Sequence, residues 1–337
     1  MNTTDFSRCL SLYFRAYLPG QKGLSTNTIA SYRDAFKLIL TYANEKHNLC
    51  PEKITLSVFN HSFIIDYLDW LERDRGCSIA TRNLRLSAIR AFAKYARSLY
   101  PEYLNESQQI IDIPAKKVAY PTIGYLTADS LKHILDQPDL STQFGRRDMV
   151  LLSVMYDSGA RVQELCDLKV RDIRLQKPYT ITLTGKGSKT RIVPIMESTA
   201  TVLKAYMAEN AMNKAEKYDE ALFFNHKHSK LTRAGIAYIL RKYCIKASEH
   251  DVTIPAKVSP HMLRHSKAMH LLQAGVPIIY IRDFLGHAHV DTTEVYAKTD
   301  TEMKRRAIEN AAIHPDVKMP SWTDDANLMQ MLKELCS

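Results

Sequence analysis

The 337-residue sequence has few of the features that mark fibrous, disordered or disulfide-bonded chains. Its 11 glycines and 13 prolines are too few for a collagen-like or linker-dominated protein. None of its six cysteines forms a Cys-x-x-Cys pair, which argues against a zinc or redox motif and favours reduced thiols in a cytoplasmic protein. The best apolar stretch, 63–71, contains two aspartates and is far shorter than the roughly 20 residues of a membrane span. Residues 1–18 lack the basic start and unbroken apolar core of a signal peptide.

Positive charge is what the sequence has in excess. Its 46 Lys and Arg residues against 36 Asp and Glu residues give a formal net charge of +10. This balance favours an acidic partner, either a nucleic acid or an anionic membrane. Apolar residues at 45% and charged residues at 24% are otherwise typical of a folded protein, and the length suits about two domains.

Residues 1–111 are predicted to form a helical domain. Apolar side chains at helical spacing predict helices over 6–17, 26–48, 60–73 and 79–99, and Pro101 ends the last of these. In this fourth helix the wheel gathers apolar residues from Leu84 to Tyr95 on one side, and no acid lies between Arg82 and Arg97. A solvated face is the alternative, but we interpret the basic half as a phosphate-contacting surface. Its members are Arg82, Arg85, Arg90, Lys94 and Arg97, and the first four of these are the predicted DNA contacts.

The remaining chain has a mixed pattern. Residues 112–125 have little periodicity and are predicted to be an interdomain linker. Alternating residues over 179–184 and 191–195 flank a glycine-rich turn and predict a β-hairpin. Helices are predicted around it, including one at 325–335. We therefore expect a mainly helical α+β fold with a mixed domain at 126–300, a small antiparallel sheet and a tail at 301–337.

Four short segments of the mixed domain carry side chains suited to phosphate chemistry. They are GARVQEL at 159–165, GKGSKTR at 185–191, HMLRH at 261–265, and LGH at 285–287, which a tyrosine follows nine residues after the histidine. Each alone is weak, because single arginines and Gly-Lys-Gly turns are common on protein surfaces. Their side chains of interest are Arg161, Lys186, His261, Arg264, His287 and Tyr296.

Together these side chains fit phosphoryl transfer without a metal. Two guanidiniums can neutralise the charge that builds on the non-bridging oxygens of a phosphodiester. A tyrosine with a pKa near 10 becomes a nucleophile beside a proton acceptor in a cationic pocket, and a lysine can protonate the leaving oxygen. Zinc at His261 and His265 is the alternative, but no third ligand is apparent. We therefore predict no metal and no cofactor.

The order and spacing of these segments resemble the tyrosine recombinases of the phage integrase family. The match spans about 126–300, with a looser helical match over 1–110. It implies a SAM-like core-binding domain and a catalytic domain that clamp double-stranded DNA. It also implies a homotetramer on paired sites, with exchange of a C-terminal helix between protomers and room for accessory DNA-bending or regulatory proteins. An ordinary helix that docks on its own domain is the alternative for the tail.

The resemblance also implies a role for each motif residue. Tyr296 attacks the scissile phosphate and forms a 3′-phosphotyrosine, while Arg161 and Arg264 clamp that phosphate. Lys186 protonates the departing 5′ oxygen. His261 assists proton transfer at the nucleophile, and His287 hydrogen-bonds a non-bridging oxygen.

Three further residues belong to the predicted site. Glu164 is expected to orient Arg161 and its helix. Lys189 and Arg191, on the hairpin, are expected to hold backbone phosphates, and Lys189 is the alternative general acid.

The implied function is site-specific recombination of the integrase or transposase type. A chromosome-dimer resolvase would use the same chemistry. A type IB topoisomerase would let strands rotate and would need no paired sites. A catalytically silent DNA-binding regulator would lack one or more of the six residues, and none is missing.

Overall fold

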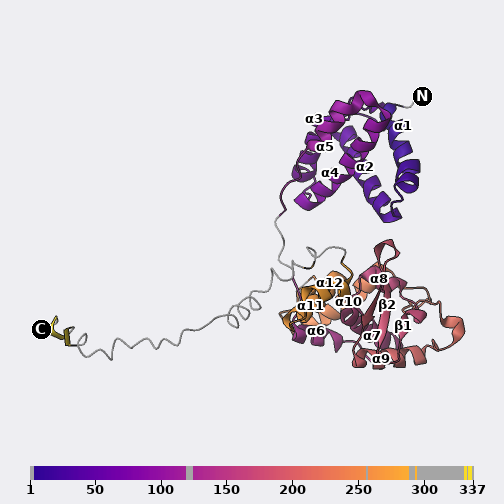
Figure 1. The fold of residues 1–337 in the computed structure, drawn as a ribbon, viewed down its shortest axis with the longest axis vertical. Coiled ribbons are helices and arrows are strands. Elements are labelled where there is room, and N and C mark those ends of the chain that lie inside the picture. Colours follow the sequence, from indigo (N-terminus) through magenta and orange to yellow (C-terminus); the bar gives the residue numbers. More distant parts are fainter. Residues whose placement is uncertain are drawn as a thin grey trace. The chain divides into compact units, whose positions relative to one another are not determined.

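The computed structural model describes residues 4–118, 124–255, 257–287, 293, 330–331 and 333–335. The chain divides into two compact units, Met1–Pro121 and Thr122–Ser337, which Figure 1 colours from indigo to magenta and from magenta onwards. The boundary between them falls within 112–125, the range predicted as a linker. In the described part of the chain, no helix is both long and apolar enough to cross a membrane.

The described part of the first unit, 4–118, is helical (Figure 1). All four predicted helices are present; the first continues into a π-helical turn, and α5 was not predicted. Their bounds are α1 (Asp5–Leu12), η1 (Tyr13–Gln21), α2 (Thr26–His47), α3 (His61–Arg73), α4 (Ile79–Leu99) and α5 (Leu104–Asp112), with short 3₁₀ turns η2 (Pro51–Lys53) and η3 (Pro101–Tyr103).

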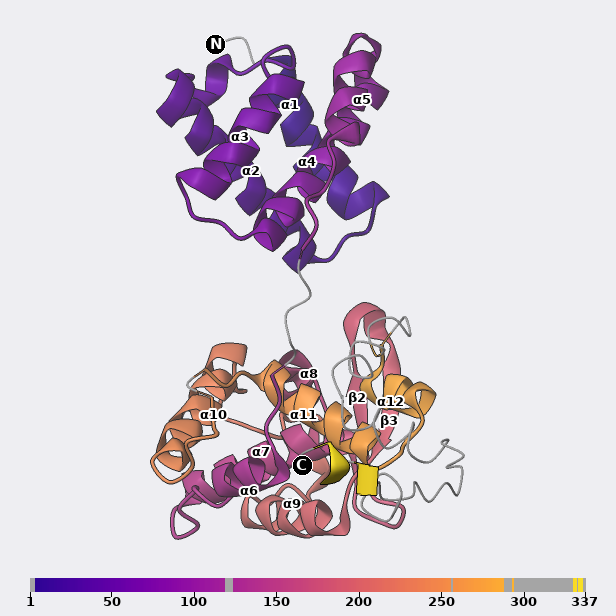
Figure 2. The ribbon, with the colours of Figure 1, turned by 90° about the vertical axis from the view of Figure 1, so that its left-hand side faces the viewer.

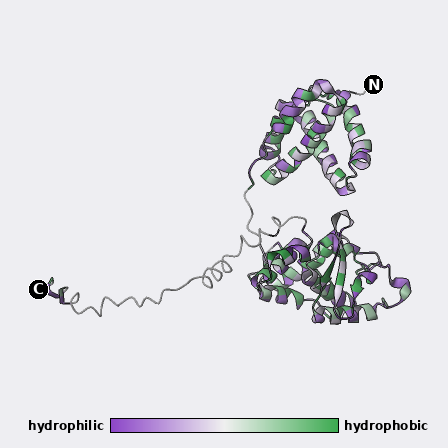
Figure 3. Ribbon diagram, in the orientation of Figure 1, coloured by the Kyte–Doolittle hydropathy of each residue, from purple (hydrophilic) through white to green (hydrophobic). Residues whose placement is uncertain are grey.

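Side-chain caps fix where these helices begin. Thr4, Ser25, Asn60 and Ser78 immediately precede α1, α2, α3 and α4, and each accepts a hydrogen bond from the backbone N–H three residues later. Such a cap stabilises a helix by about 1 kcal/mol because it pairs an otherwise orphaned donor. Figure 3 shows hydrophilic and hydrophobic residues interspersed along the helices of this unit, as expected when one face of a helix is buried.

Aromatic rings form the core of the first unit. Phe92 on α4 lies with its ring centroid 5.7 Å from that of Phe6, 5.0 Å from Phe36 and 5.5 Å from Phe59. All four rings are buried. Since they come from α1, α2, α4 and the loop before α3, this cluster joins distant parts of the unit.

The helical wheel of α4 was partly right. Ala88, Phe92 and Tyr95, placed on the apolar side, are buried. Leu84, placed on the same side, is 53% exposed, while Arg82, placed on the basic side, is 4% exposed. The Arg82 Nε lies 2.9 Å from Glu72 Oε1, and this ion pair allows a long cationic side chain to occupy a buried position.

Arg85 and Arg90 are also turned toward the protein. Arg85 Nη1 donates to the carbonyl of Ser31 at 3.2 Å, and Arg90 Nη2 donates to the carbonyl of Ile113. Both are half-buried, whereas Lys94 is exposed. Of the four predicted phosphate contacts on α4, Lys94 is therefore the one whose side chain is exposed, while Arg85 and Arg90 are partly covered.

The first residues of the predicted linker pack on α4. Asn83 Nδ2 donates to the carbonyl of Lys116 at 2.8 Å, and the Lys116 N–H donates back to Asn83 Oδ1 at 3.1 Å. The Lys116 Nζ lies 2.7 Å from Glu72 Oε1. These contacts attach the chain up to Lys116 to the first unit.

The second unit combines helices with a three-stranded antiparallel sheet in the order β1-β2-β3. The helix α7 packs against α9 and α11 (Figure 2). The bounds are α6 (Ala128–Leu135), α7 (Gln143–Ser158), α8 (Val162–Asp167), η4 (Val170–Asp172), β1 (Ile173–Arg174), β2 (Thr180–Thr184), η5 (Lys186–Ser188), β3 (Thr190–Pro194), α9 (Glu197–Glu209), η6 (Ala215–Lys217), α10 (Arg233–Ser248), α11 (Pro260–Gln273) and α12 (Ile278–Leu285).

The predicted hairpin is confirmed as β2 and β3. Ile181 pairs with Val193, and Leu183 pairs with Arg191. Ile181, Leu183 and Val193 are fully buried, so one face of the hairpin packs on the core of the unit. The short strand β1, which was not predicted, extends the sheet beside β2.

Candidate active site

Arg161 is fixed by the start of α8. The helix α7 ends at Gly159, whose φ of +56° reverses the chain without strain. Arg161 follows as the N-cap of α8, and Glu164, in the first turn, accepts its backbone N–H at 2.8 Å through Oε2. Arg161 Nη1 also donates to Glu164 Oε1 at 2.9 Å. The side chain of Arg161 remains 34% exposed.

Arg264 is held in the first turns of α11. Pro260 occupies the first helical position, and the Ser259 hydroxyl caps the helix. Arg264 is 3% exposed and bridges two segments far apart in the chain. Its Nη1 donates to the carbonyl of Gly159 at 2.6 Å, and its Nη2 donates to that of Leu285 at 2.5 Å.

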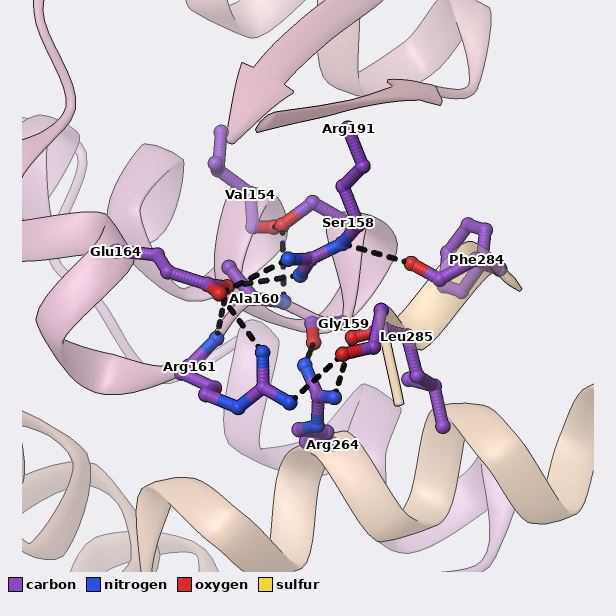
Figure 4. Close-up of polar contacts among 11 residues, drawn as sticks. Val154, Ser158, Gly159, Ala160, Arg161, Glu164, Arg191, Arg264, Phe284 and Leu285 are labelled. Atoms are coloured by element: carbon purple, nitrogen blue, oxygen red, sulfur yellow. Dashed lines mark hydrogen bonds and ion pairs between the residues drawn. The ribbon is translucent and has the colours of Figure 1, made fainter. Parts of the chain in front are cut away.

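The two arginines meet at the same stretch of backbone. Arg161 Nη2 donates to the carbonyl of Gly286 at 3.0 Å, directly after the residue that accepts from Arg264. Figure 4 shows both guanidiniums converging there, below the strand that carries Arg191. The structure thus brings the first, third and fourth sequence motifs together.

His287 directly follows Leu285 and Gly286, whose carbonyls accept from the two arginines. Its Nδ1 lies 3.0 Å from Thr293 Oγ1, a partner that the sequence gave no reason to single out. Burial, reinforced by the positive charges of Arg264 and Arg161, lowers the pKa of His287 to about 4. The ring is therefore neutral near pH 7 and can exchange hydrogen bonds without adding charge.

His261 lies exposed on α11, with its ring centroid 6.4 Å from that of His265. Burial, followed by electrostatic interactions with His261 and Arg264, lowers the pKa of His265. Within the described ranges, no group of three or more His, Cys, Asp or Glu side chains is placed to hold a metal ion.

Of the remaining predicted residues, Lys189 is fully described by the structure, whereas Lys186 is described in its backbone alone. Lys186 begins the 3₁₀ turn at the hairpin tip, but its side chain lies outside the described residues. Tyr296 lies outside them altogether. Lys189 follows the turn and is exposed, and its carbonyl accepts the N–H of Gly185 at 2.8 Å.

Arg191 has a different environment from the phosphate contact predicted for it. Its Nη1 and Nη2 donate to the two oxygens of Glu164 at 2.9 and 2.8 Å, and its Nε donates to the carbonyl of Phe284 at 3.0 Å. The side chain is 13% exposed. Strand alternation carried this signal, because Arg191 shares its face of β3 with the buried Val193.

Glu164 is the shared anion of this cluster. Burial raises the pKa of its carboxyl, but hydrogen bonds from Arg191 and Arg161 outweigh burial and hold the pKa below its usual range. One carboxylate thus faces two guanidiniums, with a third from Arg264 nearby. The cluster keeps an excess of positive charge that suits a phosphate.

Comparison with known proteins agrees with this geometry. Residues 124–303 match the phage integrase family, and residues 13–98 match its N-terminal SAM-like domain. The chain belongs to the phage integrase family. It is a tyrosine recombinase, an enzyme that cleaves and rejoins DNA strands.

The recombinase has relatives that match nearly its whole length. It is 33% identical to y4rC of Sinorhizobium fredii, which is named as an integrase/recombinase, over 97% of each chain. It is 32% identical to the tyrosine recombinase XerC of Pelotomaculum thermopropionicum, over 90% of this chain and 97% of the relative. The crystal structure of the XerH recombinase bound to its difH substrate before cleavage matches with a TM-score of 0.62 and 26% identity, covering 85% of this chain and 79% of that one.

Proposed function

We propose that Tyr296 is the nucleophile of this tyrosine recombinase and that Arg161 and Arg264 clamp the scissile phosphate. One observation carries the proposal: both guanidiniums donate to consecutive carbonyls, of Leu285 and Gly286, ten to eleven residues before that tyrosine. Cations from two distant motifs therefore converge at the segment that leads to the nucleophile.

The proposed cleavage is a transesterification. The phenolic oxygen of Tyr296 forms a bond to phosphorus while the bond from phosphorus to the 5′ oxygen breaks. His261 assists removal of the phenolic proton, and Lys186 gives a proton to the departing oxygen. Arg161, Arg264 and the neutral His287 stabilise the charge on the non-bridging oxygens. The energy of the phosphodiester stays in the 3′-phosphotyrosine, so a 5′-hydroxyl of another strand can reverse the step.

The proposed partner is double-stranded DNA, with four protomers assembled on two paired sites. The net charge of +10 supports mainly electrostatic positioning, in which affinity falls steeply with added salt. The relative XerH is named as a site-specific recombinase bound to its difH substrate, which supports a specific recombination site as the substrate of this chain as well. We assign strand exchange for a mobile element, in the cytoplasm, as the cellular role, with chromosome-dimer resolution as the alternative.

The tail is proposed to link protomers. Most of 301–337 lies outside the described residues, but residues 330–331 and 333–334 are helical, and Met331 and Leu335 are exposed. Removal of the chain from Ser321 onwards should weaken cooperative assembly on paired sites while single-site binding persists. Unchanged cooperativity would show that this helix docks elsewhere.

Nicked suicide substrates test the nucleophile. Duplexes are first selected from a random-sequence library for binding to the recombinase, then nicked so that the cleaved strand end is lost. The wild type should form an adduct that resists SDS, and Tyr296→Phe should form none. Tyr280→Phe, which alters an exposed tyrosine on α12, is the matched control and should form the adduct. An adduct with Tyr296→Phe, lost instead with Tyr280→Phe, would move the nucleophile to residue 280.

A further inference from the structure

Three segments that are distant in the sequence meet at the side chain of Arg191. The strand β3 supplies this arginine, α8 supplies the carboxylate of Glu164, and α12 supplies the carbonyl of Phe284 near its end. Each of the three guanidinium nitrogens lies within 3.0 Å of an acceptor. Figure 4 shows the fork of Arg191 directed at Glu164 on one side and Phe284 on the other.

Two glycines allow this close approach. A Cβ atom on Gly286 would lie 3.0 Å from both Cδ and Nη1 of Arg191. A Cβ atom on Gly185 would lie 3.0 Å from Glu164 Oε1. The hairpin tip therefore packs against Glu164, and the segment before His287 packs against Arg191, the two members of one ion pair.

We infer that Arg191 is a positioning residue, which holds Arg161 and the segment leading to His287 in their reacting arrangement instead of binding the DNA backbone. This inference rests on the roles proposed for Arg161 and His287. With Arg191 in place, Glu164 takes two hydrogen bonds from it and one from the Arg161 guanidinium. Arg161 consequently stays partly exposed, where a phosphate can reach it.

Loss of Arg191 would change this balance. Glu164 would then face Arg161 alone, and the attraction would draw that guanidinium inward, away from a bound phosphate. The carbonyl of Phe284 would also lose its donor, three residues before His287. Misplacement of catalytic groups by about 1 Å can slow a reaction about 100-fold. The expected defect is therefore in the chemical step and not in DNA affinity.

Two substitutions separate charge from geometry. Arg191→Gln removes both the charge and the fork, whereas Arg191→Lys keeps the charge and loses the fork. Lys204→Gln, at an exposed position on α9, is the control for the loss of one positive charge. Each variant is measured for its DNA dissociation constant at several salt concentrations and for its single-turnover cleavage rate at saturating nicked duplex. Circular dichroism measures the folded fraction of each variant. If Arg191→Gln does not fold, the test rests on Arg191→Lys.

The inference expects both Arg191 variants to cleave about 100-fold more slowly at saturation, with unchanged dissociation constants and salt slopes. In Arg191→Gln alone, the pKa of His287, followed by NMR, should rise, because a nearby positive charge is lost. Wild-type cleavage of bound DNA by these variants would overturn the inference. Weaker binding with a salt slope reduced by about one would return Arg191 to the DNA backbone.

Cleavage by the unmodified recombinase is established first in the same assay. If the wild type forms the adduct and Arg191→Gln forms it as fast, only the inference about Arg191 fails. If the wild type forms no adduct at all, the proposed roles of Arg161 and His287 fail, and the inference is overturned with them.

Discussion

A methyl group added at Gly286 should disturb the site more than the same change at a matched glycine. Gly286 has a φ of +66°, and an ideal Cβ there would lie 3.0 Å from Arg191 Cδ and Nη1. The left-handed backbone costs an L-residue about 1–2 kcal/mol. The contact adds about 1–3 kcal/mol of overpacking, because Arg191 is held by its three hydrogen bonds. We expect Gly286→Ala to lose about 2–5 kcal/mol of unfolding free energy.

Gly275→Ala isolates the contact from the backbone. Gly275 has a φ of +83°, and a Cβ there would have nothing within 4 Å, so only the backbone cost of about 1–2 kcal/mol applies. Amide hydrogen exchange of peptides from α7 and α11 measures the opening free energy of the second unit in the full chain. The cleavage rate of Gly286→Ala should also fall below that of Gly275→Ala, since the Gly286 carbonyl accepts from Arg161. Equal losses in the two variants would refute the proposed packing of Arg191 against this glycine.

Two further predictions concern buried charge. Glu164→Gln leaves two guanidiniums without their carboxylate and should lower the free energy of unfolding in urea by about 3–5 kcal/mol. The control Glu209→Gln removes a carboxylate from a surface pair with Arg146 and should lower it by less than about 1 kcal/mol. Similar losses in the two variants would contradict a buried ion pair at Glu164. His287 has a pKa lowered to about 4, so its folded form binds fewer protons than the unfolded chain between pH 6.5 and 4. Its contribution to stability is present above pH 6.5 and is lost as the pH falls. Between pH 7.5 and pH 5, the free energy of unfolding should therefore fall less in His287→Gln than in the wild type. An equal fall in both proteins would show that His287 does not cause this pH dependence.

Local sequence rules predicted much of the second unit. The hairpin followed from alternation around a glycine-rich turn, and β2 and β3 confirm it. Pro260, which suits the first position of a helix, begins α11, and Gly159 ends α7. These signals are short-range, because caps, turns and strand alternation depend on neighbours within a few residues. The alternation of β3 also indicated the inward direction of Arg191, because it places Arg191 on the same face as the buried Val193.

The wheel of α4 misplaced Arg82 because it treats every arginine as a surface residue. Arg82 is buried through an ion pair with Glu72, on the preceding helix, and sequence periodicity carries no information about that partner. The convergence of Arg161 and Arg264 had the same long-range character. It could be expected from the resemblance between motifs, but their common anchor, the carbonyls of Leu285 and Gly286, is a property of the folded backbone.

The way these guanidiniums are anchored explains how the site keeps a net positive charge although the three side chains repel one another. Three guanidiniums close together repel one another, yet a carboxylate for each would cancel the charge needed for a phosphate. Here one buried carboxylate serves Arg161 and Arg191, and neutral carbonyls hold Arg264. Carbonyl dipoles fix a guanidinium while leaving its net charge intact, so the attraction for an anion is built in before DNA arrives. On this argument, an added acid beside Arg264 would stabilise the empty site and slow cleavage, since it would compete with the phosphate for that guanidinium.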